Sequence, residues 1–272
     1  MEMKRICALY WSATGNTKQV TMAVAKGAAE IFACPMETVD FSSPKGREAA
    51  RKFDADTLLV AGFPTYAGKL PNKILPDVQQ KLKGNGALAA AVVTYGNRSF
   101  DNSLAELAFT LGENGFTVAG GAALPCRHAF SDLLAPGRPD QEDLKQATQF
   151  GRDLAEKIQR GEAEEPVQVP GDAAAPYYVP KGTDGAPAKF LKAKPLTDPE
   201  KCNHCGDCVK LCPVGSISAE NVFEVPGVCI KCQACVRGCK QGAKYFDDAA
   251  FLSHVAMLEQ NFTERKEAEY FL

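Results

Sequence analysis

Five short apolar runs, separated by helical or polar segments, organise the first part of the chain. They span residues 6–11, 36–41, 57–62, 87–93 and 118–124. The fourth run is apolar at every position, as expected for a central parallel strand that is buried on both faces. The alternation predicts an α/β fold with a five-stranded, doubly wound parallel sheet. Such a sheet binds its ligand outside the carboxyl ends of the strands.

Apolar residues at helical spacing predict the helices around this sheet. One helix follows the first strand, a short one is expected over residues 45–53, and another over residues 103–114. Asp140 is placed to cap a long helix that ends at Gly161. Two aspartates precede an apolar stripe near the end of the chain, so residues 247–272 are expected to form a C-terminal helix.

The loop after the first strand joins a buried strand to the N-terminus of a helix. The free N–H groups of a first helical turn favour an anion such as phosphate. The loop adds four neutral polar side chains: Ser12, Thr14, Asn16 and Thr17. It has neither the Gly-Lys-Ser/Thr ending of a Walker loop nor a Gly-x-Gly-x-x-Gly run. The alternative is an ordinary capped helix start.

This Ser-x-Thr-Gly-Asn-Thr loop resembles the loop that binds the FMN phosphate in flavodoxins. The resemblance covers residues 3–160, and the fifth strand has no long insertion, as in the short-chain form. It implies that FMN is bound and that the loops at 62–71 and 94–101 hold the flavin ring. The implied FMN contacts are Ser12, Thr14, Gly15, Asn16, Thr17, Pro64, Thr65, Tyr66, Ala67, Gly68, Thr94, Tyr95, Gly96 and Asn97.

Two tyrosines in these loops are candidates to stack on the flavin. Tyr66 and Tyr95 each offer an aromatic face that can cover the ring while the hydroxyl stays wet. The alternative for each is an ordinary loop or core aromatic. His128, just after the fifth strand, is expected to be a satisfied loop histidine rather than a pocket residue.

A proline-rich stretch divides the chain. Residues 162–196 lack periodicity and contain six prolines, so they are expected to form an extended, semi-rigid linker. Its aromatic residues indicate that parts of it pack on a domain. The predicted organisation is an FMN-binding domain over residues 1–161, the linker, a small α+β domain over residues 197–246, and the C-terminal helix.

Eight of the eleven cysteines form two copies of one motif, Cys-x2-Cys-x2-Cys-x3-Cys. In such a motif three thiolates can take three corners of a 4Fe-4S cluster, while the fourth cysteine points toward the other cluster. The ligand sets are therefore expected to interleave. One cluster is assigned to Cys202, Cys205, Cys208 and Cys239, and the other to Cys229, Cys232, Cys235 and Cys212.

Zinc sites and a disulfide framework are the alternatives for these cysteines. Zinc sites need only two close cysteine pairs, and disulfide frameworks are typical of small secreted chains. The double motif resembles the bacterial-type two-cluster ferredoxin. It departs from that family at Lys240, which stands where the first motif has Pro213, so a less constrained chain is expected after the second motif. His204 is expected to be exposed rather than a ligand.

Composition excludes some classes of function. The formal net charge of −2 gives no reason to expect binding to nucleic acid. No run of 18 apolar residues and no leader pattern is present, which favours a soluble, cytoplasmic protein without membrane insertion. Thiolates that must bind iron indicate a reducing compartment, and exposed low-potential clusters would suit an anaerobe.

The whole chain resembles fusions of a flavodoxin with a two-cluster ferredoxin, which implies electron transfer among FMN, two 4Fe-4S clusters and protein redox partners. No Ser-His-Asp set and no hydrolase metal motif is present. Two alternatives stay open. One is a flavin-dependent reductase of a small acceptor such as a quinone or metabolite, and the other is the electron-input subunit of a larger complex. The oligomeric state and the donor and acceptor are left open.

Overall fold

A six-stranded sheet forms the centre of the computed structural model, which describes residues 3–272. The strand order is β10-β7-β6-β4-β1-β2. Five strands are parallel: β1 Arg5–Tyr10, β2 Met36–Asp40, β4 Thr57–Pro64, β6 Leu88–Tyr95 and β7 Thr117–Pro125. The predicted parallel sheet is therefore confirmed. Among its parallel strands the order follows the 2-1-3-4-5 pattern of flavodoxin-like doubly wound folds.

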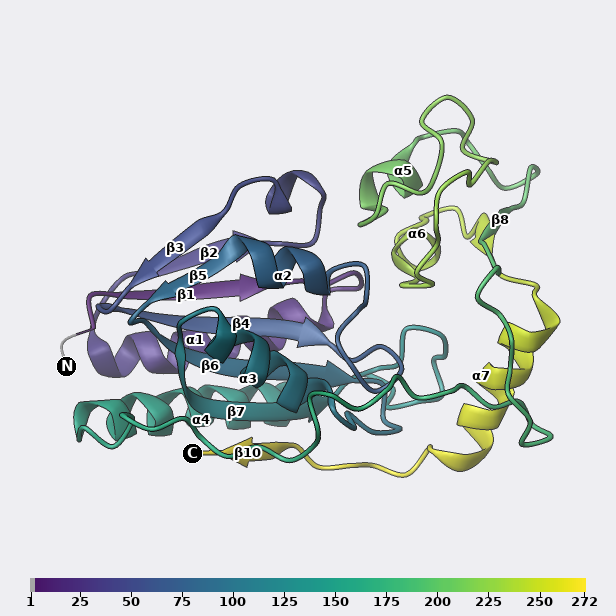
Figure 1. The fold of residues 1–272 in the computed structure, drawn as a ribbon. Coiled ribbons are helices and arrows are strands. Elements are labelled where there is room, and N and C mark those ends of the chain that lie inside the picture. The colour runs from purple at the N-terminus through teal and green to yellow at the C-terminus, as the bar shows by residue number, and fades with distance from the viewer. Residues whose placement is uncertain (1–2) are drawn as a thin grey trace.

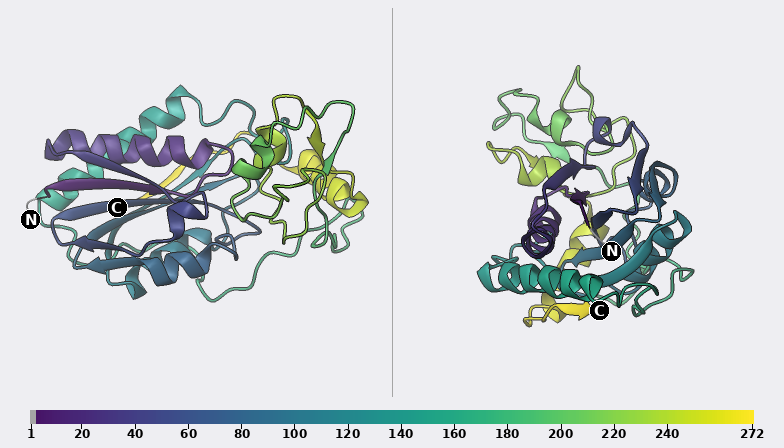
Figure 2. Two further views of the ribbon diagram at one scale, coloured as in Figure 1. Left: turned by 90° about the horizontal axis from the view of Figure 1, so that it is seen from above. Right: turned by 90° about the vertical axis from the view of Figure 1, so that its left-hand side faces the viewer.

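Helices cover both faces of the sheet (Figures 1 and 2). Helices α1 (Asn16–Phe32) and α4 (Gln141–Gln159) lie on one face, and α2 (Leu75–Lys81) and α3 (Ser103–Glu113) on the other. Alternate strand residues divide between two apolar clusters, one for each face. Helices α1 and α4 cross closely at two glycines, Gly27 and Gly151. A Cβ on Gly27 would lie only 2.0 Å from Thr148 O, so a larger residue would not fit there.

The helix predicted over residues 45–53 is wrong. The chain forms one 3-10 turn, η1 (Lys45–Arg47), and then a strand, β3 (Arg51–Asp54). Strand β3 pairs in parallel with β5 (Leu82–Asn85) as a separate two-stranded sheet. The reason lies in a short period of two, in which Phe53 is buried against Phe116 while its neighbours are exposed.

The C-terminal segment is only partly helical. Helix α7 (Ala249–Asn261) begins at the predicted aspartate cap, where the Asp248 side chain accepts a hydrogen bond from Phe251 N at 2.8 Å. The chain then leaves the helix and ends in β10 (Glu269–Phe271), antiparallel to the sheet edge at β7. The expected helix through residue 272 is therefore too long, because Tyr270 stacks on Phe150 and the free edge of β7 pairs with the chain.

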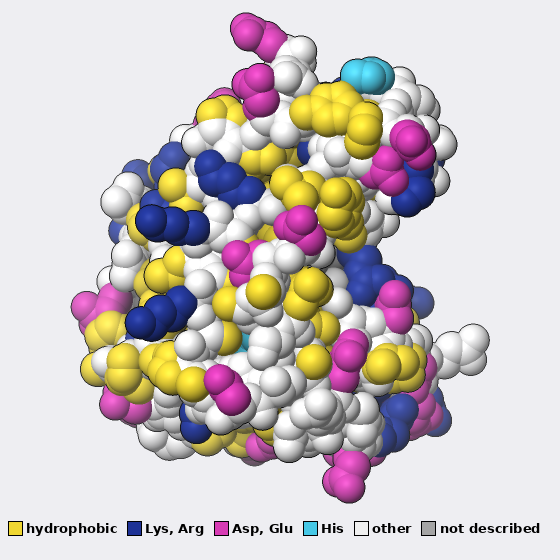
Figure 3. All heavy atoms as spheres, turned by 90° about the vertical axis from the view of Figure 1, so that its right-hand side faces the viewer, with side chains coloured by type: hydrophobic (Ala, Val, Ile, Leu, Met, Phe, Trp, Pro, Cys, Tyr) yellow, Lys and Arg dark blue, Asp and Glu magenta, His cyan; other side chains and the backbone are white. Residues whose placement is uncertain are grey.

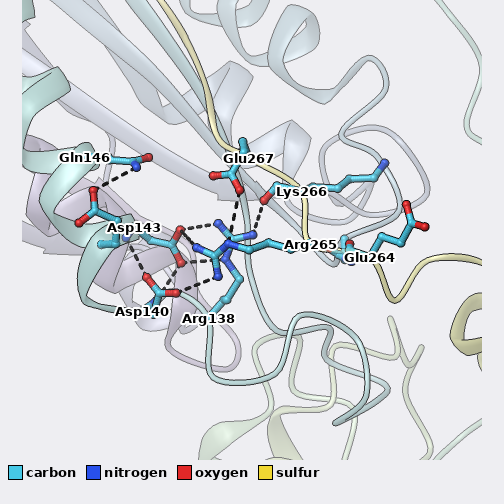
Figure 4. Close-up of polar contacts among 10 residues, drawn as sticks. Arg138, Asp140, Asp143, Gln146, Glu264, Arg265, Lys266 and Glu267 are labelled. Carbon is cyan, nitrogen blue, oxygen red and sulfur yellow. Dashed lines mark hydrogen bonds and ion pairs between the residues drawn. The ribbon is translucent and has the colours of Figure 1, made fainter.

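Ion pairs hold the segment between α7 and β10 against the start of α4 (Figure 4). Arg138 and Asp143 form a buried ion pair, and Arg138 also donates to Lys266 O. Arg265 pairs with Asp140, the N-cap residue of α4, at 3.0 Å. The last residues of the chain are thus fastened to the sheet region, residues 3–161.

The cysteine region, residues 197–245, lies at the carboxyl ends of the parallel strands (Figures 1 and 2). It contains α5 (Asp207–Leu211) and α6 (Ala234–Arg237), and β9 (Lys244–Tyr245) pairs with β8 (Leu196–Thr197). Between α4 and β8 no further helix or strand occurs in the described chain. Within residues 3–272, no helix has the length and apolar character needed to span a bilayer.

Candidate cofactor sites

A cavity of about 620 Å³ lies where the sheet region meets the cysteine region. Its volume is in the range of sites that enclose small ligands or cofactors. The walls come from the loops after β1, β4, β6 and β7, from the cysteine region and from α7. Part of the linker, residues 171–194, also contributes, and we call this segment the strap. The cavity is thus built at the strand ends where a doubly wound sheet binds its ligand.

The cavity brings together most of the residues that the sequence implied for FMN. The lining residues among them are Thr14, Asn16, Thr17, Pro64, Thr65, Tyr66, Ala67, Gly68, Thr94, Tyr95 and Gly96. Ser12, Gly15 and Asn97 do not line it. Three loops that are far apart in the sequence therefore face one space.

The N-terminus of α1 is open toward an anion. Its N-cap residue is Gly15, which has a φ of 94° and no side chain, so the N-cap residue itself satisfies none of the first-turn N–H groups. The Thr17 and Thr94 hydroxyls share a hydrogen bond of 2.8 Å between the first and third loops. Ser12 has a structural task instead, because its hydroxyl accepts from Lys18 N at 3.2 Å. These features fit a phosphate at the helix N-terminus.

The two candidate tyrosines have different surroundings. Tyr66 is half-buried, and its ring meets Trp11 edge to face at a centroid distance of 5.7 Å. Burial raises the pKa of Tyr66 well above its ordinary value, and the nearby thiolates of Cys232 and Cys229 raise it further. Tyr95 is only 5% exposed and packs against Phe100, so little of its ring is left for a ligand.

Asn97 was implied as a flavin contact, but its side chain points elsewhere. It is fully buried, and its Nδ2 donates to Phe262 O at 2.6 Å and to Glu264 O at 2.8 Å. These bonds hold the C-terminal segment in place. That role could not be seen in the sequence, because the residues lie 165 or more positions apart.

His128 lines the cavity, contrary to the expectation of an ordinary loop histidine. Its Nδ1 accepts from Phe130 N at 3.1 Å, so a neutral ring carries its proton on Nε2. Burial, together with the charges of His254, Arg237 and Arg98, lowers the pKa of His128 to about 3. The histidine is therefore a neutral hydrogen-bond donor near pH 7.

The strap and α7 close the outer side of the cavity, which sequence reasoning missed. The added wall residues are Tyr177, Tyr178, Pro180, Phe190, Leu191, His254 and Leu258. The strap is fastened to the loop after β4: Tyr178 N donates to Ala67 O, and Lys69 Nζ donates to Ala173 O, each at 2.8 Å. The aromatic residues of the linker were the one signal in the sequence.

The cysteines predicted to hold the first cluster surround one small cavity. Cys202, Cys205, Cys208 and Cys239 all line it. The last of them comes from the second motif, as interleaved ligand sets require. The side chain of Lys244, which is 3% exposed, also lines this cavity, and His204 is exposed.

The other four cysteines lie close to one another. Burial, together with the neighbouring Cys229 and Cys212, raises the pKa of Cys235 to about 12. The same neighbours act on Cys232, whose pKa is also raised by burial. Within residues 3–272, no three His, Cys, Asp or Glu side chains converge as they would on a single metal ion. Four thiols grouped in each set are the donors that a 4Fe-4S cluster takes.

The turn after the second motif is not less constrained than the turn after the first. Ser216 N donates to Cys212 Sγ at 3.2 Å, and Ala243 N donates to Cys239 Sγ at 3.3 Å. A glycine three residues after each cysteine, Gly215 or Gly242, has a φ of 61°. The glycine makes the turn in both motifs, so replacing Pro213 by Lys240 leaves the backbone unchanged.

The second motif packs directly on the sheet region. Cys232 and Ala234 belong to the apolar cluster on the α3 face of the sheet, and Cys229 and Cys232 line the large cavity. Arg237 Nε of the second motif donates to Ala129 O at 3.0 Å. Arg47 Nη2 donates to Pro213 O, at the end of the first motif, at 2.7 Å. One predicted cluster set therefore borders the predicted flavin cavity.

Comparisons with known proteins agree with part of this description. Residues 194–217, which contain the first motif, match the family of 4Fe-4S binding domains. A search of curated proteins found no match.

Solved structures that resemble the chain include three flavodoxins. A flavodoxin from the domain Archaea is 21% identical, with 58% of this chain and 99% of that chain covered and a TM-score of 0.37. Flavodoxin 2 from Bacillus cereus is 18% identical, with 57% and 99% covered and a TM-score of 0.39. A variant flavodoxin of Fusobacterium nucleatum bound to flavin mononucleotide is 15% identical, with 58% and 97% covered and a TM-score of 0.36.

Proposed function

We propose that the protein relays electrons between FMN in the large cavity and two 4Fe-4S clusters, and exchanges them with other redox proteins. The observation that carries this proposal is the shared wall: Cys229 and Cys232 line the same cavity as the three strand-end loops. A flavin can hold one or two electrons whereas each cluster passes one, so the pair can store electrons and release them singly.

The residues of the chain divide the work of holding the cofactor. The open first turn of α1 and the Thr14 and Thr17 hydroxyls would bind the phosphate. Tyr66 would lie beside the ring, on the side that faces the second motif, and the backbone at Gly68 and Gly96 would approach the ring edge. His128 would donate one neutral hydrogen bond from the wall after β7.

The cysteines would hold the two clusters in interleaved sets. The set containing Cys232 would lie next to the cavity, and the set containing Cys205 would lie further out, since Cys205 is exposed while Cys232 is 8% exposed. Thiolate ligands suit a reducing compartment, and we propose a cytoplasmic location for that reason.

The test is anaerobic reconstitution with FMN, iron and sulfide. We expect one bound FMN and about eight irons for two clusters. Laser-flash reduction of the flavin should be followed by absorbance changes of both the flavin and the clusters at one matching rate. A chain that binds zinc in place of iron, or a flavin that stays reduced while the clusters stay oxidised, would contradict the relay.

A second candidate is the reduction of a small acceptor, such as a quinone, at the flavin. It is favoured by the apolar outer wall, where Phe190 and Leu258 extend the cavity beyond the strand-end loops. Turnover of a soluble quinone with saturation, lost on replacing Phe190 by Asp without loss of FMN, would support it. Turnover that rises linearly with quinone and ignores this substitution would leave only the relay.

A further inference from the structure

Two exposed apolar side chains stand at the outer border of the large cavity. Leu191 of the strap is 89% exposed, and Val228 is 62% exposed. Both also line the cavity, and Lys231 joins their segments by donating to Leu191 O and to Cys229 O. Val228 directly precedes Cys229, a predicted ligand of the inner cluster. An apolar spot therefore lies on the surface above the second motif.

Three exposed lysines, Lys189, Lys192 and Lys194, lie within three residues of Leu191 in the sequence. Lys194 lies next to the second motif, since its Nζ donates to Val225 O at 2.6 Å. Within residues 3–272, none of the three pairs with a carboxylate. Figure 3 looks onto this end of the molecule and shows Lys and Arg side chains on both sides of the view, with apolar and acidic side chains between them.

The surface around the first motif is different. There Lys201 pairs with Asp198 at 2.8 Å and Lys210 approaches Asp207 at 3.8 Å, so each positive charge has its own counter-charge. The lysines beside Leu191 have no such partner in the described chain. Unpaired charge around an apolar centre is the arrangement that attracts and orients a partner of opposite charge.

We propose that Leu191 and Val228, with Lys189, Lys192 and Lys194, form the docking surface for a small acidic one-electron carrier protein. The proposal rests on the proposed relay and adds where the electron enters. One electron leaves the reduced carrier and enters the cofactors of this protein, so the carrier is oxidised by one electron and no bond or proton changes. The entry point is the second motif, beside the flavin cavity, and not the first motif.

The test uses the reconstituted full chain and an acidic bacterial two-cluster ferredoxin as the probe. The variant Lys189→Glu/Lys192→Glu reverses two strap charges. The matched control Lys201→Glu/Lys210→Glu makes the same change in net charge on the face of the first motif. Stopped-flow mixing with the reduced ferredoxin gives the second-order rate constant at several salt concentrations.

We expect the strap variant to slow the reaction about tenfold or more at low salt, and the control to slow it much less. The difference in rate constant between the two variants should disappear near 1 M salt, where the Debye length is only roughly 3 Å. Leu191→Ser should slow the reaction at every salt concentration, because the loss is of apolar contact. Equal slowing of the strap variant and the control would overturn the docking surface.

Two further measurements separate this proposal from the relay. Binding of the oxidised ferredoxin, measured by calorimetric titration, needs no electron transfer and should weaken in the strap variant but not in the control. Flash-induced exchange between flavin and clusters should be unchanged in both variants. If the unmodified protein shows no electron exchange between flavin and clusters, the proposed relay is wrong. The binding measurements would still show whether the docking surface is used.

Discussion

The two cysteine motifs have the same spacing but opposite surroundings. The first lies outward, with Cys205 exposed, whereas Cys232 and Cys235 of the second are each 8% exposed and packed against the sheet region. The backbone turn after each motif is the same. Spacing therefore sets how a motif can hold a cluster, while its neighbours decide what the cluster can exchange electrons with. In the proposed relay, the second motif would hold most of the ligands of the inner cluster and the first motif most of those of the outer cluster.

Removing one ligand from each motif tests this difference most strongly. Cys232→Ala should reduce the rate of exchange between flavin and clusters by about 100-fold or more, because it removes the cluster next to the cavity and electron transfer then has to cross a larger gap. Cys205→Ala should remove the outer cluster and leave flavin exchange with the inner cluster near its original rate. Flash photolysis, with iron content and the FMN spectrum as checks, measures both.

Similar loss of exchange in the two variants would mean that the motifs do not differ in role. Collapse of both clusters in either variant would show in the iron content, and Cys232→Ser and Cys205→Ser would then be compared, because serine retains an oxygen ligand. If the Cys232 variant keeps only the outer cluster and still exchanges electrons with the flavin at the original rate, then the outer cluster is the direct partner of the flavin.

Arg47, which is 6% exposed, joins the sheet region to the end of the first motif. Its guanidinium donates to Asp77 at 2.8 Å, to Phe41 O at 3.0 Å and to Pro213 O at 2.7 Å. Arg47→Ala leaves the carbonyls unpaired and leaves the Asp77 carboxylate only the more distant Lys81 ammonium at 3.8 Å, which should cost about 3 kcal/mol of unfolding free energy. Because Pro213 follows the ligand Cys212, exchange with the flavin should slow about tenfold while FMN stays bound.

Arg152→Ala is the matched control for Arg47. Arg152 also forms an ion pair, with Glu30, whose Oε2 accepts from Nε and Nη2, but on the helical face away from the cysteine region and at more than a third exposure. Its loss should cost at most about 1 kcal/mol and leave exchange unchanged. Urea titration and flash photolysis of both variants provide the comparison. A slowed Arg152 variant would show that exchange follows general stability and not the contact at Pro213.

Periodicity was sufficient to predict most of the sheet region, because each parallel strand and helix is a local pattern with a local period. It failed where partners are distant in the sequence. Phe53 belongs to a strand only because β5 pairs with β3, and β10 exists because the edge of β7 was open to pairing. Neither partner is visible from local spacing.

The candidate site shows the same limit. Thr14, Tyr66 and Gly96 could be predicted to share a cavity because they follow strands of one sheet edge. The contacts of the Asn97 side chain could not be predicted, since its partners belong to a C-terminal segment whose path is set by Arg138 and Arg265. The outer wall was missed for a similar reason, because a strap without periodicity gives no signal of where it packs.

Acid should lower the free energy of unfolding through His128, whose charged neighbours include Arg237 of the second motif. Its folded pKa of about 3 lies below the ordinary value of 6.5, so below pH 6.5 the unfolded chain binds a proton that the folded chain does not. Stability is therefore present above pH 6.5 and is lost as the pH falls toward 3, with a slope of at most about 1.4 kcal/mol per pH unit from this group. Urea midpoints from pH 7 to 5 measure the slope.

The neighbours of His128 set the control for that measurement. His254, Arg237 and Arg98 face it, and burial also lowers the pKa of His254. His128→Asn should flatten the slope between pH 6.5 and 5, while His254→Asn should flatten it less. An unchanged slope in the His128 variant would mean that acid acts elsewhere, and the second motif would have no special sensitivity.

The smallest expected effect concerns Lys244 in the outer site. It lies five residues after Cys239, at the position where the first motif has the buried Ile217, and it is itself 3% exposed beside the cysteines of the outer set. A buried ammonium stabilises the added electron, so Lys244→Met should lower the potential of the outer cluster by roughly 30 mV, or about 0.7 kcal/mol for one electron. The inner cluster should change less.

Lys240→Met, which removes an exposed lysine beside the same cysteine, is the control and should shift the potential by only a few millivolts, because solvent screens its charge. Redox titration followed by electron paramagnetic resonance separates the two clusters. A larger shift at the inner cluster would show that Lys244 acts mainly on that cluster. The potential of the outer cluster would then be set by its solvent exposure and not by Lys244.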